Sequence, residues 1–124
     1  MTKTDMTLEE IMQEMTVSGD TFPFELTFPD GKTLTLDVRE LTWTDQSDAF
    51  GKSFIITLKE GQPVMEYQPT TFRIEILKKR LVKPPFPLTE AVLRQIKPEV
   101  GAQLDSLVPD PFSKMVEAQA LPKD

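Results

Sequence analysis

The residues that could carry acid–base chemistry are carboxylates, because the chain contains neither histidine nor cysteine. Without these residue types, a Ser-His-Asp triad, a cysteine nucleophile and a thiolate or imidazole metal site are excluded. Asp45 and Asp48 are three residues apart and share one face of a helix, so they could bind a divalent cation or act as acid and base. Acids also suit a solvated helix start, and we favour that interpretation.

Other chemistry-bearing patterns are missing from the sequence. The five glycines are scattered and form no phosphate-binding loop, and there is no Asp-x-Asp-x-Asp calcium loop. We therefore expect no catalytic residue, no cofactor and no metal. The protein is predicted not to be an enzyme, with carboxylate catalysis as the weakest alternative.

The charge of the sequence argues against nucleic-acid binding, and its short apolar runs argue against a membrane span. The net charge is −6, with 14 basic and 20 acidic residues, whereas nucleic-acid binding calls for a basic surface. The basic cluster Lys78, Lys79, Arg80 and Lys83 could meet an acidic partner, but cations at a helix end also complement its dipole. No apolar run could span a bilayer, and the N-terminus lacks a signal-peptide pattern, so we expect an intracellular, soluble protein.

The N-terminal segment is predicted to form a short amphipathic helix. Thr7 and Glu10 have the spacing of a capping box. Four apolar residues then follow at helical spacing and share one face: Leu8, Ile11, Met12 and Met15. Two turns are too few for an isolated helix, so this one must dock on its own domain or on a partner.

A β-hairpin is predicted next. Apolar residues alternate in 22–28 and in 33–41, and Pro29-Asp30-Gly31-Lys32 between them has the composition of a turn. Residues 54–58 are less clear. They could form a strand that pairs with 64–67, or continue a helix that begins near Thr42 or Thr44; we favour the helix, with Trp43, Phe50 and Phe72 in the core.

Helices dominate the predicted second half. One is expected over 70–83, ended by Pro84-Pro85, another over 88–96 with Thr89 as N-cap, and a last one that begins at Pro98. The fold class is α+β: an N-terminal short helix and β-hairpin followed by a small bundle of three or four helices. The predicted division is 1–21 (helix and joint), 22–109 (single α+β domain) and 110–124 (C-terminal tail).

Six methionines and eight phenylalanines suggest adaptable apolar contacts. Most should fill the core, but both terminal segments are short and amphipathic, and each is set off by a joint or by prolines. We predict that these segments bind a protein partner through seven residues: Leu8, Ile11, Met12, Met15, Phe112, Met115 and Val116.

The order of several segments supplies a resemblance. Glu40-Leu41-Thr42-Trp43 opens a helix, and a turn-rich middle leads to a helix that runs into Lys83-Pro84-Pro85. Phe86-Pro87-Leu88-Thr89 and a run from Ile96 to Leu104 follow. In this order, residues 41–109 resemble a tail assembly chaperone of long-tailed bacteriophages, or of related prophage and contractile tail systems.

The resemblance implies a non-enzymatic role in the host cytoplasm. Such chaperones bind the long helical tape measure protein, keep it soluble and help tail tube subunits assemble around it. The alternatives are a structural tail or baseplate subunit of the mature virion and a small protein-binding adaptor. Whether the protein forms a homo-oligomer is left open.

Overall fold

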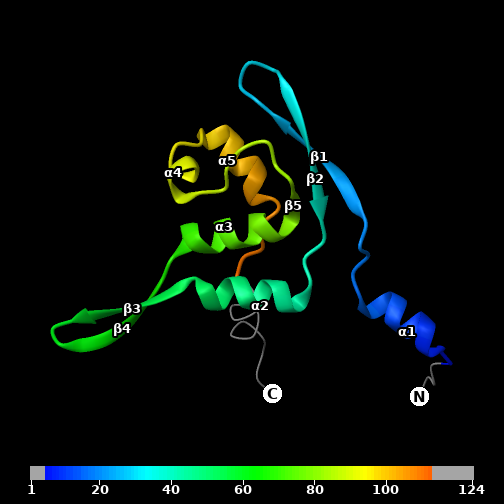
Figure 1. Cartoon of the computed structure of the whole chain (residues 1–124), viewed down its shortest axis with the longest axis horizontal. Helices are drawn as coiled ribbons and strands as arrows, with labels where there is room; N and C mark the ends of the chain where they lie inside the picture. Colours follow the sequence, from blue (N-terminus) through cyan, green and yellow to red (C-terminus); the bar gives the residue numbers. More distant parts are fainter. Residues whose placement is uncertain (1–4, 113–124) are drawn as a thin grey trace, which may run out of the picture.

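The computed structural model describes residues 5–112, in which helices and hairpins alternate (Figure 1). The elements in chain order are α1 Leu8–Met15, β1 Thr21–Thr27, β2 Thr33–Arg39, α2 Trp43–Lys52, β3 Phe54–Lys59, β4 Gln62–Tyr67, α3 Pro69–Arg80, β5 Leu81–Val82, α4 Glu90–Leu93 and α5 Pro98–Asp105. This is an α+β arrangement, as predicted.

The first hairpin, β1–β2, confirms the sequence prediction. Its antiparallel register runs from Thr21 opposite Arg39 to Thr27 opposite Thr33. Gly31 turns the chain with φ of 89°, a backbone angle that glycine adopts without steric cost. The two-residue strand β5 adds to β2, which gives a three-stranded antiparallel sheet in the order β1-β2-β5.

The apolar face of this sheet forms one half of the core. Because alternate residues of a strand point to the same face, the aligned apolar residues of β1 and β2 lie on one side. Side chains of α3, α5 and the segment after α5 cover that side. The buried members of this cluster are Leu26, Leu36, Val38, Leu77, Leu81, Leu104 and Leu107.

Helix α3 joins this cluster to a second one. Its Leu77 faces the sheet, whereas Phe72 and Ile76 pack with Ala49 of α2. The exposed fractions of Phe72, Ile76 and Leu77 are all 2% or less. Burial on two sides makes α3 the central helix of the molecule.

Polar side chains fasten the helices to the sheet. The guanidinium of Arg80 donates from Nε to the carbonyl of Arg39 (3.0 Å) and from Nη1 to the carbonyl of Leu107 (2.8 Å). The Gln103 amide bonds both backbone groups of Thr27, each at 2.7 Å, so it pairs with the outer edge of β1 as a neighbouring strand would. The Gln103 contact positions α5 against β1, and the Arg80 contact positions the segment after α5.

The prediction of helix for residues 54–58 is wrong, because these residues form β3 of a second hairpin. The β3–β4 connection is Glu60-Gly61, with φ of 54° and 77°, the positive values of a tight two-residue hairpin turn. Buried Ser53 ends α2, and its carbonyl accepts from the Gln68 amide at 2.6 Å. The hairpin is thereby closed at its base.

The predicted helical bundle is also wrong, because a hairpin separates α2 from α3 and the later helices are short. Helix α3 stops at Arg80, three residues before the predicted end, and the chain continues as strand β5. Helix α4 has 4 residues and α5 has 8. The prolines of residues 84–87 prevent a longer continuous helix here.

The two core clusters predict where truncation is costly. Ile76→Ala should lower the free energy of unfolding by about 2–5 kcal/mol, because removing this buried side chain leaves a cavity between packed elements. Ile56→Ala, at a side chain that is 71% exposed, should change it by less than about 0.5 kcal/mol. Urea denaturation of both variants measures the difference, and equal losses would contradict the core assignment.

Candidate partner-binding surfaces

The carboxylate pair is a helix cap and not an assembled site. The Asp45 carboxylate accepts from the Thr42 amide (3.3 Å), while the Thr42 hydroxyl accepts from the Asp45 amide (3.0 Å), which completes a capping box. Lys79 of α3 lies 3.8 Å from the same carboxylate. Within residues 5–112, no three acidic, histidine or cysteine side chains are grouped as metal ligands. Asp48 is exposed on the helix surface.

Helix α1 presents the predicted apolar face to solvent. Thr7 caps the helix by accepting from the Glu10 amide at 3.1 Å, as expected. No residue of α1 is buried, and the exposed fractions of Leu8 and Met15 are 75% and 76%. Ile11 and Met12 are exposed to a lesser degree. All four side chains are thus accessible to a partner.

Of the three predicted partner-binding residues near the C-terminus, only Phe112 lies within the described residues. Phe112 is half-buried, and its ring packs edge-on against Phe50 (centroids 5.5 Å apart) and Tyr67 (5.0 Å). It therefore belongs to an aromatic cluster between α2, β4 and α3. Met115 and Val116 lie outside the described residues.

Trp43 corrects another prediction, since it is not in the core. Phe72 is buried and Phe50 half-buried, but Trp43 at the start of α2 is 87% exposed. It borders a shallow groove of about 210 Å³ that extends along α2 to Phe50 and Phe72. An indole with this exposure is a common contact residue in protein interfaces.

The second hairpin has one apolar face that the sequence analysis missed. Directly opposed residues of an antiparallel pair lie on the same face of the ladder. The opposed pairs on one face are Phe54 with Tyr67, Ile56 with Met65 and Leu58 with Pro63. The exposed fractions of Ile56, Leu58 and Met65 are 71%, 74% and 66%. The apolar residues at 54, 56 and 58 were the sequence signal for it, although apolar Ile55 between them breaks the alternation.

The other face of this hairpin is more polar, with Thr57, Lys59, Gln62 and Glu66 beside Ile55 and Val64. Lys59 forms an ion pair with Glu66 at 2.9 Å, and the Thr57 hydroxyl donates to the same carboxylate at 3.3 Å. The hydrogen bond and the charge of Lys59 lower the pKa of the Glu66 carboxyl, against a weaker opposing effect of burial. The hairpin is thus amphipathic.

The apolar hairpin face continues into the body of the molecule. Phe54 packs against Phe50 at 4.9 Å and against Tyr67 at 5.5 Å. Phe50 also lines the Trp43 groove, so the groove and the hairpin face meet at this ring, although polar Gln46 and Ser47 lie in the groove between Trp43 and Phe50. We call this surface the apolar strip; its residues are Trp43, Phe50, Phe54, Ile56, Leu58, Met65 and Tyr67.

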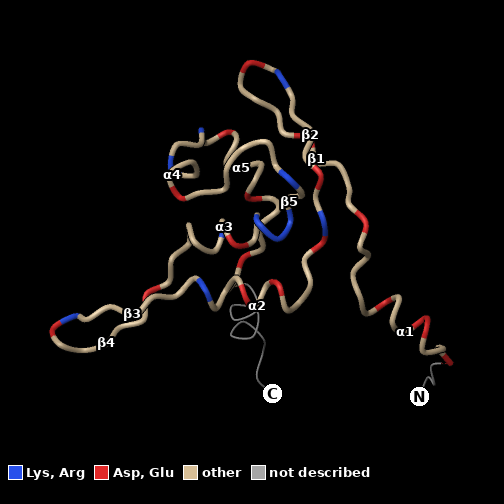
Figure 2. The backbone as a smooth tube through the Cα atoms, in the orientation of Figure 1, with Lys and Arg blue, Asp and Glu red and all other residues tan. Residues whose placement is uncertain are grey.

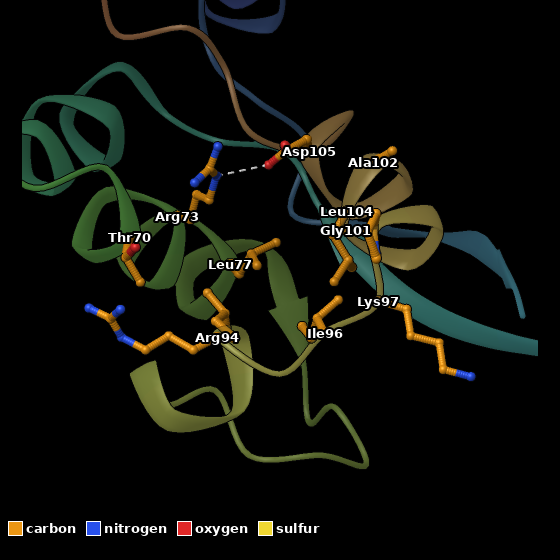
Figure 3. Close-up of a pocket in the computed structure, with 12 residues that line it drawn as sticks. Thr70, Arg73, Leu77, Arg94, Ile96, Lys97, Gly101, Ala102, Leu104 and Asp105 are labelled. Carbon is orange, nitrogen blue, oxygen red and sulfur yellow. Dashed lines mark hydrogen bonds and ion pairs between the residues drawn. The ribbon is translucent and has the colours of Figure 1, made fainter.

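A third surface lies on the other side of α3. A groove of about 370 Å³ runs between α3, α4 and α5, and we call it the α3–α5 groove (Figure 3). Apolar side chains line it, including Leu77, Ile96 and Leu104. Arg73, paired with Asp105 at 3.0 Å, Arg94 and Lys97 stand at its border. Figure 3 shows the long side chains of Arg94 and Lys97 extending in opposite directions.

The predicted basic cluster has mixed roles. Burial lowers the pKa of the Arg80 guanidinium, which contacts carbonyls and lies 5.8 Å over the ring of Phe22, so this residue is structural. Lys79 faces Asp45. Lys78 and Lys83 are exposed. Figure 2 shows the acidic residues of the N-terminal segment well apart from these cations.

Comparisons with known proteins give no indication of function, which therefore has to be inferred from these surfaces. No family model, curated protein or solved structure significantly matches the chain. None of the helices within residues 5–112 has the length and apolar character needed to cross a bilayer.

The polar hairpin face predicts a specific titration. Lys59→Met should raise the pKa of Glu66 toward its ordinary value, because the main hydrogen bond and the nearby positive charge are both lost. Because the pKa of Glu66 is lower in the folded than in the unfolded chain, its ionised carboxylate stabilises the folded hairpin at pH values above the unfolded pKa. This stabilisation is lost as the pH falls through the folded pKa. A ¹³C NMR titration measures the shift, with Lys52→Met as the control. An unchanged Glu66 pKa in Lys59→Met would contradict the ion pair between Lys59 and Glu66.

Proposed function

We propose that this protein is a non-catalytic chaperone that binds apolar segments of a helical protein partner. The observation that carries the proposal is the apolar strip, in which Ile56, Leu58 and Met65 are mostly exposed although the chain has a separate buried core. An exposed apolar surface of this extent in a soluble domain marks an interaction site.

The composition of the strip suits weak binding to many similar sequences. Met65 and the aromatic rings offer flexible and broad apolar contacts, which tolerate variation in the partner. The hairpin also projects from the body in Figure 1, so a long partner can lie along it without meeting the rest of the chain. An amphipathic helix docks by its apolar face on such a surface.

Helix α1 supplies a second contact in this proposal. Its exposed face has the same chemistry as the strip, with Met12 and Met15 beside Leu8 and Ile11. The predicted C-terminal contact is reduced to Met115 and Val116, since the Phe112 ring already packs against Phe50 and Tyr67.

The resemblance of residues 41–109 suggests which partner this is. We propose the tape measure protein of a bacteriophage or related tail, bound in the host cytoplasm while tube subunits assemble around it. A structural tail or baseplate subunit would share the exposed strip but would be found in the mature particle. An adaptor would form a stable complex outside any tail system.

Co-expression with the long helical protein encoded next to this one tests the proposal. We expect the two to co-purify and the helical protein to stay soluble. Leu58→Asp should reduce the recovered complex at least tenfold, because a charge is buried in the contact. Gln62→Asp is the matched control, since Gln62 lies on the polar face of the same hairpin.

The outcomes of this experiment separate the alternatives. Equal recovery with both variants would show that the strip does not bind the partner. Recovery of this protein in purified particles, without rescue of the helical protein, would favour the structural subunit.

Helix α1 gives a second prediction. Replacing Ile11 and Met12 with Asp should abolish partner binding and leave folding intact, because neither side chain is buried. Gln13→Asp, on the opposite face of the helix, should bind normally. Circular dichroism and thermal melting report folding, and loss of the folded state in the double variant would mean that α1 belongs to the core.

A further inference from the structure

The α3–α5 groove and helix α1 are complementary in apolar character. Of the apolar residues that line the groove, Leu77 and Leu104 belong to the buried core, whereas Leu93 and Ile96 are half-buried and Ala102 is exposed. Helix α1 offers one continuous apolar face of four residues, none of them buried. The chain thus carries both an apolar groove and an apolar helix that fits such a groove.

Their charges are complementary as well. Residues 5–20 contain five acidic residues and no basic one. At 100° per residue, Glu9 and Glu14 flank the apolar face of α1 on its two sides. Arg73, Arg94 and Lys97 border the groove; Arg73 pairs with Asp105 (3.0 Å) and Arg94 with Glu90 (2.6 Å), and Lys97 adds an exposed positive charge. An acidic amphipathic helix would therefore meet opposite charge on the groove border.

Helix α1 does not occupy the groove of its own chain in this structure. No residue of α1 lines the groove, none of its residues is buried, and Figure 1 shows α1 extending away from α4 and α5.

We propose that α1 of one copy docks in the α3–α5 groove of a second copy. The contact joins two different surfaces, so two copies can exchange their α1 helices reciprocally, or more copies can form a ring or chain. Self-association shields the apolar face of α1 from water until a partner competes for it. The contact does not need the proposed partner, so it can be tested on the protein alone.

The mass of the purified protein in solution tests this inference. Light scattering after gel filtration should give an oligomer that dissociates with dilution and with added salt, since opposite charges contribute to the contact. Ile11→Asp with Met12→Asp should give a monomer at concentrations where the unchanged protein is an oligomer. Gln13→Asp should leave the mass unchanged.

Charge reversal separates the groove from other surfaces. Arg94→Glu with Lys97→Glu should weaken self-association at least tenfold, and so should Glu9→Lys with Glu14→Lys. The chain that carries all four substitutions should regain much of the lost association, because the charges match again. Lys32→Glu with Lys83→Glu, at two exposed lysines outside the groove, is the control for net charge.

Three results would overturn the inference. The first is a monomer at all concentrations for the unchanged protein. The second is an oligomer that persists in the Ile11 and Met12 variant, which would place the contact elsewhere. The third is a monomer in which Lys97→Glu removes hydrogen-exchange protection from α1, which would mean docking in its own groove.

Discussion

The fold depends on the simultaneous burial of α3 on two sides. Leu77 packs on the sheet while Phe72 and Ile76 pack on α2, and a helix can present both sets because they occur about 100° or more apart around its axis. Arg80 at the end of the same helix bonds carbonyls of β2 and of the segment after α5. The sheet, α2 and the C-terminal helices are all positioned relative to this one element.

This arrangement explains why so much apolar surface is left outside. Helix α3 uses its own apolar residues to join two small clusters, and within residues 5–112 the outer half of the second hairpin and α1 both remain exposed. The hairpin is held at its base by the Ser53–Gln68 bond and the aromatic cluster, and its outer half is free to contact another molecule. Stable core and binding surface are therefore separate parts of the same chain.

Local sequence signals were read correctly where the local interaction is strong. The Thr7 cap, the Pro29-to-Lys32 turn and the Thr42 and Thr89 caps are short-range features, and all occur as expected. For residues 54–58 the helix was wrongly favoured over the strand alternative, because the turn is Glu60-Gly61, in which a glutamate adopts positive φ, and because helical spacing of Ala49, Phe50 and Phe54 competes with alternation. The bundle prediction failed with it.

The sequence by itself determined the absence of histidine and cysteine chemistry, the amphipathic character of α1 and the alternation that defines the first hairpin. Tertiary structure decided that Trp43 is exposed, that Phe112 packs in an aromatic cluster and that Leu77, Ile96 and Leu104 line one groove. The physical reason is the sequence separation over which each kind of interaction acts. Caps and turns depend on residues within about four positions, whereas burial depends on which distant elements meet, and here that is set by packing around α3.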